Sequence, residues 1–198
     1  MKVVVAIAIS VVSGFSLTET VVGAPVVSGF SRTQTPRATT IVVTSATIKA
    51  DQPIPRDHTA DGRNVSPPLT WTNVPAGARE LAVVLEDPDA GNPPPFVHWV
   101  IYKIPPSANG LPENIPFEPG APMPAAIAGA VQGTSGFRRP IYRGPAPPPG
   151  KVHHYHFVVY ALDAALDLKP GLTRAELLEA IKGHVSGQGE LVATYERK

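Results

Sequence analysis

Glu80-Leu81-Ala82-Val83-Val84-Leu85-Glu86 decides the fold, and it runs directly into Asp87-Pro88-Asp89-Ala90. Successive side chains of an extended strand point to opposite faces, so this stretch is apolar on both faces. Both faces are therefore predicted to be covered, as in a central strand of a sheet. The strand is predicted to end at the Asp-Pro-Asp turn, because proline is excluded from the middle of a sheet. Functional residues often gather at such strand ends.

Short apolar runs broken by proline and glycine surround this strand, which favours strands over helices. The clearest further strands are Val97 to Ile104, His154 to Ala161 and Leu191 to Tyr195. Proline accounts for 24 of the 198 residues, well above its usual share of about 5%. A chain of this length is expected to fold as one loop-rich domain.

One helix is predicted near the C-terminus, because Thr173 and Glu176 have the spacing of a capping box. Leu177 and Ile181 belong to its apolar stripe, and Gly183 suits its end. Many strands followed by a late helix predict a mainly β fold. We expect an antiparallel β-sandwich with one or two covering helices near the C-terminus.

The charge and the cysteine count exclude several classes of protein. With 17 basic and 16 acidic residues the formal net charge is +1, so no strong field would attract nucleic acid or an anionic membrane. The sequence has no cysteine, which excludes disulfides, thiolate catalysis and cysteine-bound metal. Any bound anion must therefore be held by local groups.

The N-terminal segment is predicted to direct export. Lys2 precedes a short apolar run in residues 3–9, and residues 1–24 are expected to form a signal peptide. That run is too short to span a bilayer, so no stable membrane span is expected. Residues 25–40 are predicted to be a flexible linker and residues 41–198 the folded domain. The expected location is secreted or periplasmic, with the cytoplasm as the alternative.

The Asp87-Pro88-Asp89 turn and His98 are candidates for a polar site. The aspartates have a simpler interpretation, since Asp-Pro-Asp is a common turn sequence. His98 lies inside an apolar strand, where a lone histidine is usually a satisfied core residue. If the Asp87 carboxylate reached this imidazole, it would fix its tautomer and favour its protonated form, which could then hold an anion.

The segment from Gly144 to Tyr155 supplies the other candidates. His153 and Tyr155 share one strand face by the two-residue period, whereas His154 and His156 share the other. The preceding Gly-Pro-Ala-Pro-Pro-Pro-Gly run is stiff and can form a preorganised rim. Its alternative interpretation is a loop that only blocks a sheet edge.

Metal binding and catalysis have weaker support. His154 and His156 could both face one metal ion, but two ligands do not make a site, so no metal and no cofactor are predicted. The sequence has no nucleophile elbow and no phosphate loop. No catalytic residue is therefore predicted, and hydrolysis by an Asp/His pair stays a minor alternative.

In order and spacing these motifs resemble the phosphatidylethanolamine-binding protein family, in particular its bacterial branch, the Raf kinase inhibitor-like proteins. The matching segments are Asp61 to Trp71, Asp87 to Ala90, His98-Trp99, Tyr142 to Pro145, and Gly183 to Leu191. The resemblance implies an antiparallel β-sandwich with a small pocket for phosphate or phosphoryl head groups. Carried over by position, the pocket residues are Asp87, Pro88, His98, Gly144, Pro145, His153 and Tyr155.

The chain departs from the bacterial pattern at several places. Ala146 stands where a cysteine is frequent, and residues 134–141 are atypical for the family, which affects the expected shape of the rim. The sequence ends at Lys198 without the C-terminal helix of the animal proteins, so kinase regulation is not carried over from them. The bacterial relatives make a homodimer plausible.

The leading hypothesis is a non-enzymatic protein that binds a phosphate-like anion or phosphorylated small ligand. The alternative is an inhibitor of a partner kinase or protease that uses the Pro147-Pro148-Pro149 loop as its contact surface.

Overall fold

Strand β4 (Glu80–Asp87) lies inside a six-stranded sheet with the strand order β1-β9-β8-β4-β5-β7. Its neighbours, β5 (Phe96–Ile104) and β8 (His153–Leu162), both run antiparallel to it. Every residue from Leu81 to Leu85 is completely buried, which confirms that both faces of this strand are covered. The decisive stretch is therefore the apolar centre of the larger sheet.

The computed structural model describes residues 38–91, 93–118 and 121–198. A second sheet has the order β2-β3-β6 and is antiparallel throughout. The remaining elements are β1 (Thr39–Thr40), β2 (Val42–Thr44), β3 (Leu69–Thr72), β6 (Gly110–Leu111), β7 (Val131–Gln132), β9 (Val185–Tyr195), α1 (Arg174–Ala180), and the 3-10 turns Arg56–His58 and Ala125–Ile127. The predicted antiparallel sandwich is thus confirmed, with one exception: β1 joins β9 in parallel.

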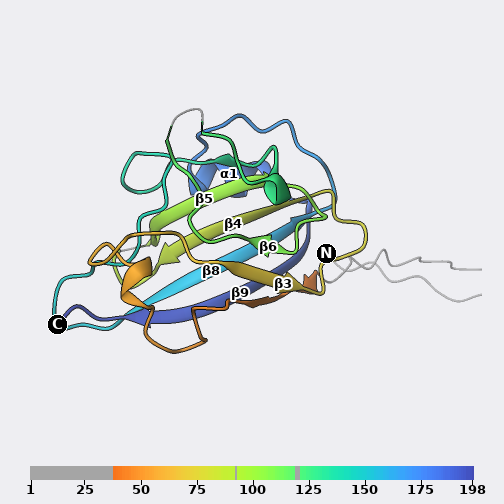
Figure 1. Ribbon diagram of the computed structural model, residues 1–198. Coiled ribbons are helices and arrows are strands. Elements are labelled where there is room, and N and C mark those ends of the chain that lie inside the picture. Colours follow the sequence, from red (N-terminus) through yellow and green to blue (C-terminus); the bar gives the residue numbers. More distant parts are fainter. Residues whose placement is uncertain (1–37, 92, 119–120) are drawn as a thin grey trace, which may run out of the picture. The chain divides into compact units, whose positions relative to one another are not determined.

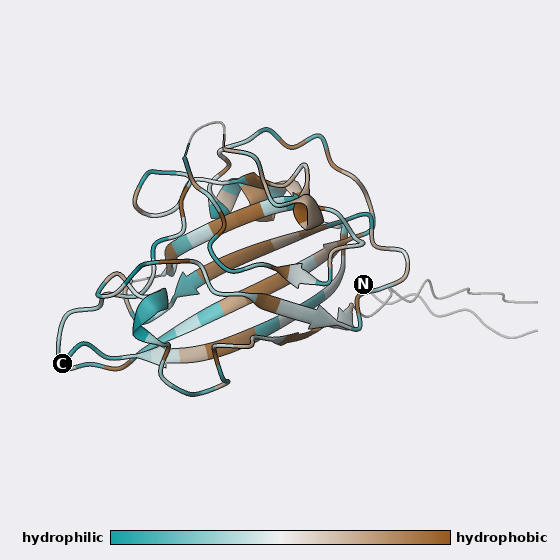
Figure 2. Ribbon diagram, viewed as in Figure 1, coloured by the Kyte–Doolittle hydropathy of each residue, from teal (hydrophilic) through white to brown (hydrophobic). Residues whose placement is uncertain are grey.

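The two sheets and the helix form three layers. In Figure 1 the three-stranded sheet lies in front of the six-stranded sheet, and α1 lies behind it. Leu81, Val83 and Leu85 pack in the core between the sheets, whereas Ala82 and Val84 pack in a second cluster on the helix side. Figure 2 shows the result as mainly hydrophobic central strands with more polar loops around them. The larger sheet therefore has two separate cores.

Helix α1 begins as the sequence predicts. Thr173 accepts a hydrogen bond from the Glu176 amide, and the Glu176 carboxylate accepts one from the Thr173 amide, which completes the capping box. Leu177 and Ile181 are buried in the helix-side core, and Gly183 follows with a φ of +84°. No helix among the described residues is both long and apolar enough to cross a membrane.

The element boundaries differ from the predicted ones at the two ends of the domain. The predicted strand Leu191 to Tyr195 is the second half of β9, which begins at Val185. Strand β1 pairs with Gly187 and Gln188 of β9, so sheet structure starts at Thr39, two residues before the predicted domain start. The predicted signal peptide and most of the predicted linker lie outside the described residues.

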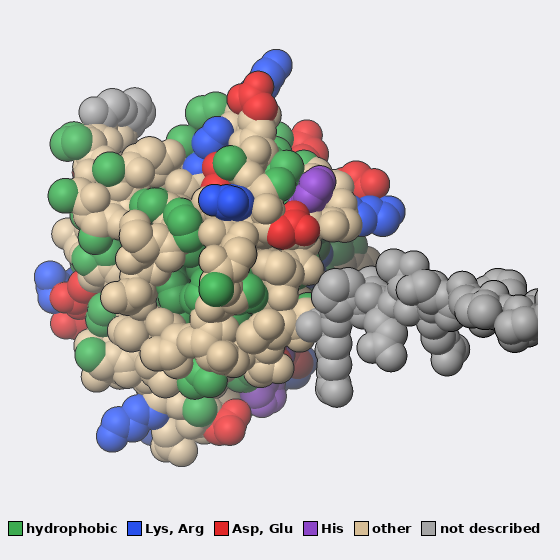
Figure 3. All heavy atoms as spheres, turned by 90° about the vertical axis from the view of Figure 1, so that its right-hand side faces the viewer, with side chains coloured by type: hydrophobic (Ala, Val, Ile, Leu, Met, Phe, Trp, Pro, Cys, Tyr) green, Lys and Arg blue, Asp and Glu red, His purple; other side chains and the backbone are tan. Residues whose placement is uncertain are grey.

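The visible charges fit the near-neutral composition. On the face of the described residues drawn in Figure 3, Lys and Arg side chains are interspersed with Asp and Glu. Mixed charges of this kind produce no strong local field on that face.

Candidate functional site

A cavity of about 490 Å³ lies where β4 ends and β8 begins. It is lined by five of the seven predicted site residues: Asp87, His98, Gly144, His153 and Tyr155. Pro88 and Pro145 are not among its lining residues. Because β4 lies between β5 and β8, the ends of these three strands bring polar side chains from distant parts of the sequence to one place.

The buried pair of the cavity is Asp87 with His153. One carboxylate oxygen of Asp87 accepts hydrogen bonds from the amides of Asp89 (2.9 Å) and Ala90 (3.0 Å), and the other lies 2.8 Å from His153 Nδ1. The side chains of Asp87 and His153 are only 1% and 6% exposed. Asp87 therefore shapes the turn, as its simpler interpretation predicts, and also fixes a histidine through Nδ1.

The histidine that Asp87 contacts is not the one the sequence analysis proposed. His98 Nδ1 instead lies 2.7 Å from the backbone oxygen of Arg143. Asp87 thus bonds in the direction of β8, while its other oxygen is held by the turn amides. The condition for a protonated His98, a direct bond from Asp87, is therefore not met, and burial lowers the pKa of this imidazole.

The Tyr155 side chain is buried between the two histidines. Its ring centroid lies 5.3 Å from that of His98 and 6.5 Å from that of His153. Burial, reinforced by the nearby Asp87 carboxylate, raises the pKa of Tyr155 far above its ordinary value. The phenol therefore stays protonated and can donate a hydrogen bond.

Gly144 has a structural role that the sequence analysis missed. Its amide donates to the Asn64 side-chain oxygen at 2.8 Å, so this N–H is already used and is not a free donor for an anion. A β-carbon on Gly144 would lie 2.1 Å from the backbone oxygen of His58. The glycine is thus required by the close approach of the protein's own backbone rather than by a ligand.

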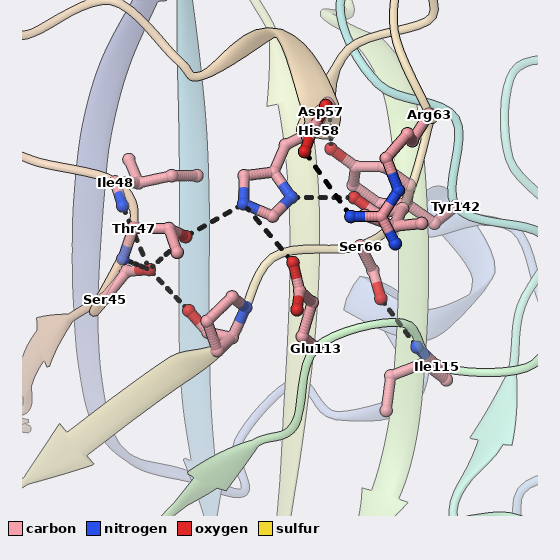
Figure 4. Close-up of polar contacts among 12 residues, drawn as sticks. Ser45, Thr47, Ile48, Asp57, His58, Arg63, Ser66, Glu113, Ile115 and Tyr142 are labelled. Atoms are coloured by element: carbon pink, nitrogen blue, oxygen red, sulfur yellow. Dashed lines mark hydrogen bonds and ion pairs between the residues drawn. The ribbon is translucent and has the colours of Figure 1, made fainter.

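A buried histidine, His58, holds that backbone in place (Figure 4). Its Nδ1 lies 3.0 Å from the Val65 oxygen and its Nε2 lies 2.9 Å from the Thr47 hydroxyl. The Tyr142 hydroxyl donates to the His58 backbone oxygen. The Asp61 to Trp71 motif therefore contributes to a frame behind the pocket wall, and the sequence alone gave no sign that His58 would be its centre.

The other face of β8 carries His154 and His156, as the strand period predicts. His154 Nδ1 lies 2.8 Å from Asp89, and His156 Nδ1 lies 3.0 Å from Glu190. Within the described part of the chain, no group of three His, Cys, Asp or Glu side chains could hold a metal ion. These two histidines take part in separate ion pairs.

Two aromatic and two basic side chains that were not predicted from the sequence also line the cavity. Phe96 and Phe137 pack edge to face, with centroids 5.0 Å apart, and both rings form T-shaped contacts with His98. The Arg143 guanidinium lies 4.7 Å from the Phe137 ring centroid, and Lys151 lines the cavity beside Asp89. Phe137 belongs to the atypical segment 134–141, and Arg143 lies two residues after it. That segment therefore supplies part of the cavity wall.

The comparisons with known proteins give one consistent family. Residues 44–196 match the family model described as phosphatidylethanolamine-binding protein. A UPF0098 protein of Methanothermobacter thermautotrophicus is 46% identical over 144 residues, which are 73% of this chain and 91% of that protein. The protein described as lipoprotein LppC of Mycobacterium tuberculosis is 39% identical over 162 residues, covering 81% of this chain and 75% of the relative.

Solved structures agree with the sequence matches. The crystal structure of Escherichia coli YbcL, described as a member of the mammalian PEBP family, superposes with a TM-score of 0.72 at 31% identity. That match covers 82% of this chain and 100% of YbcL. A homologue of the same family from Chlamydia trachomatis gives a TM-score of 0.67 at 34% identity, covering 80% and 99% of the two chains.

Proposed function

The chain belongs to the phosphatidylethanolamine-binding protein family, and from this premise we propose that its pocket binds a phosphate-like anion or a phospholipid head group without transforming it. The observation that carries the proposal is the buried contact of Asp87 with His153 at 2.8 Å. This contact holds the His153 imidazole in the cavity wall, with the Asp87 carboxylate bonded to its Nδ1 atom. A carboxylate in that position fixes the tautomer and orientation of the imidazole, so that its second nitrogen is presented to a ligand.

The bound anion would be held by His153 and Tyr155. Because His153 Nδ1 is directed at Asp87, its Nε2 is the atom left for a ligand, and the neutral Tyr155 phenol adds a second donor. Charge-assisted hydrogen bonds are worth about 1.5–3 kcal/mol each, so one imidazolium contributes about tenfold or more in affinity. The exposed cations Arg143 and Lys151 can attract anions to the opening.

Titration with inorganic phosphate and O-phosphorylethanolamine, followed by NMR, tests this proposal. His153→Gln should weaken binding about tenfold or more, because the cationic donor is lost. His156→Gln is the matched control, since that histidine pairs with Glu190 on the opposite face of the same strand. Equal affinity of wild type and His153→Gln would reject the assignment of this site.

Anion binding should also be coupled to proton uptake. If His153 becomes charged in the complex, calorimetry near pH 7 in two buffers of different ionisation heat should show protons taken up on binding. That uptake should be smaller in His153→Gln. An unchanged value would mean that the positive charge comes from elsewhere.

A partner kinase or protease is the second candidate for the same region. Pro148 and Pro149 are exposed at the cavity, and a stiff loop loses little entropy on association. Replacing both prolines with glycine should weaken capture of such a partner if the loop is the contact surface. Undiminished capture by the glycine variant would count against this candidate.

Export is part of the proposal. The relative LppC is described as a lipoprotein, and this agrees with the signal peptide expected in residues 1–24. Fractionation of cells that express the full chain should place the protein outside the cytoplasm, and recovery in the cytoplasm alone would contradict export.

Hydrolysis remains the weakest alternative. The Asp87–His153 pair has the geometry of a general base, but the lining residues include no serine, threonine or cysteine that it could activate. Hydrolysis would therefore need a water molecule as nucleophile. Generic phosphoesters and carboxyl esters should be turned over no faster by wild type than by His153→Gln.

A further inference from the structure

The two histidines of the cavity offer different groups to a ligand. His98 Nδ1 faces the Arg143 backbone oxygen at 2.7 Å, and because a carbonyl can only accept, this nitrogen carries a hydrogen. His153 Nδ1 faces the Asp87 carboxylate at 2.8 Å and carries a hydrogen for the same reason. In each ring Nε2 is therefore the atom that remains for a ligand.

The Nε2 atom of His98 opens into the cavity. No residue of the described ranges hydrogen-bonds to it, and within those ranges no fully buried side-chain nitrogen or oxygen lacks a partner. This nitrogen therefore keeps some exposed surface, although His98 as a whole is only 4% exposed. Since His98 lines the cavity, that surface faces the space where a ligand would sit.

The His98 ring is neutral in the free protein. Burial, the strongest influence, lowers its pKa, and the nearby cationic or potentially cationic groups Arg143 and His153 act in the same direction. The bond to the Arg143 carbonyl and the charge of Asp87 oppose this shift but do not reverse it. Asp87 bonds the turn amides and His153, whereas the Nδ1 atom of His98 bonds the Arg143 oxygen. The exposed Nε2 of His98 is thus a lone pair, an acceptor.

We propose that the pocket selects an anion that carries its own acidic hydrogen, such as hydrogenphosphate or the monoanion of a phosphomonoester, over anions that have only acceptor oxygens. The inference rests on the proposed function and narrows its ligand class to free phosphate and protonated monoesters, which leaves out the phosphodiester head group of an intact phospholipid. His98 Nε2 accepts the P–OH hydrogen, while His153 and Tyr155 donate to the other oxygens. The Tyr155 ring lies between the two histidines, so the three groups form one wall.

An anion without a hydrogen meets an unfavourable contact at His98. One of its oxygens would face a lone pair, or the buried ring would have to take up a proton against its desolvation. Sulfate, phosphodiesters and the dianion of a phosphomonoester are of this kind near pH 7. Sulfate has the same tetrahedral shape as phosphate and nearly the same size. The two anions therefore differ mainly in the acidic hydrogen that His98 Nε2 would accept.

The test is a set of titrations of the full chain at pH 7 with inorganic phosphate, sulfate and dimethyl phosphate, each by NMR. Phosphate should bind at least about tenfold more tightly than sulfate and dimethyl phosphate, because a site built around a ligand hydrogen rejects analogues that lack it. The wild-type comparison needs no variant. Equal affinities for phosphate and sulfate would overturn the selectivity while leaving anion binding intact, whereas no binding of any probe would overturn the proposed function itself.

Two variants locate the selectivity. His98→Gln places an amide at the cavity that can rotate to donate, so the ratio of phosphate to sulfate affinity should fall close to one. His156→Gln, on the opposite face, should leave the ratio unchanged. A ratio that persists in His98→Gln would assign the selectivity to another group and reject the role of His98.

A spectroscopic measurement covers the case in which His98→Gln does not fold. Long-range proton–nitrogen correlation spectra of the wild type distinguish the two neutral tautomers and the charged ring. They should show His98 as the neutral tautomer protonated at Nδ1, with Nε2 changing its shift on phosphate addition. A charged His98 ring in the free protein at pH 7 would refute the inference.

Discussion

Asp87 and Asp89 are separated by a single proline, and each meets a histidine of β8 at the same distance. Asp87 lies 2.8 Å from His153 Nδ1, and Asp89 lies 2.8 Å from His154 Nδ1. The first pair is almost completely buried, with side chains 1% and 6% exposed, whereas the second is 30% and 51% exposed. Two identical distances on opposite faces of one strand therefore have very different electrostatic consequences.

The difference shows that burial, rather than distance, decides whether a carboxylate–histidine pair can serve as part of a binding site. Water competes for both partners of the exposed pair and screens their charges, so the pair contributes little. The buried pair has lost that water, so each partner depends on the other and the free imidazole nitrogen is held in one orientation. Only the pair that includes Asp87 can therefore act as a preorganised binding group.

The largest contrast is expected in stability. Asp87→Ala should lower the free energy of unfolding by about 3–5 kcal/mol, because it leaves His153 buried without its partner and removes the acceptor of two turn amides. Asp89→Ala should cost at most about 1 kcal/mol. Urea denaturation of both variants measures the difference, and equal losses would contradict the distinction by burial.

The second contrast is expected in ligand affinity. Asp87→Asn keeps the shape of the side chain but removes the charge behind His153, so phosphate should bind about tenfold more weakly. Asp89→Asn should change the affinity less than about twofold, since Asp89 lines the cavity but is partly exposed to water and its histidine lies on the other face of β8. Calorimetric titration of both variants with phosphate is the measurement. A larger loss of affinity in Asp89→Asn than in Asp87→Asn would contradict the assignment of the buried pair as the binding group. The phosphate-to-sulfate ratio should stay unchanged in Asp87→Asn, because His98 sets it.

The smallest contrast concerns the pH dependence of stability. Burial lowers the pKa of His98, so below about pH 6.5, the ordinary pKa of histidine, the unfolded chain binds a proton that the folded protein resists. Stability should therefore fall as the pH drops through this range. The exposed Asp89 has its pKa lowered by His154, so its contribution is present above the unfolded pKa near about 4 and is lost only at lower pH.

Urea denaturation between pH 7 and pH 3 separates the two groups. His98→Gln should reduce the loss of stability between pH 6.5 and 5, and Asp89→Asn should change only the loss below about pH 4. A wild-type stability that stays flat from pH 7 to 5, with the loss unchanged in His98→Gln, would show that His98 is protonated as easily in the folded state as in the unfolded state.

Much of the fold could be predicted from local patterns. The apolar period of Glu80–Asp87 predicted a strand covered on both faces, and the Thr173–Glu176 spacing predicted the start of the helix; the structure has both. The first half of β9 could not be found in this way, because Val185 to Glu190 is rich in glycine and polar residues. Its pairing with β8 determines that segment, and no local signal shows this pairing.

The candidate site was predictable only in part. Strand parity separated His153 from His154 correctly, because the two-residue period is a property of the chain itself. Parity could not choose between His98 and His153 as the partner of Asp87, since β5 and β8 both flank β4. The structure shows that Asp87 meets His153, while His98 bonds the Arg143 oxygen and the turn amides bond the other Asp87 oxygen.

The sequence by itself determined the long strands β4, β5 and β8, the start of the helix, the family resemblance and the set of polar residues that share a strand face. Only the tertiary structure decided which residue each of them meets: His153 for Asp87, the Arg143 carbonyl for His98, and Asn64 for the Gly144 amide. The physical reason is that side-chain direction along a strand is a local property. Partner, burial and protonation state depend on segments far apart in the chain that come together only when it folds.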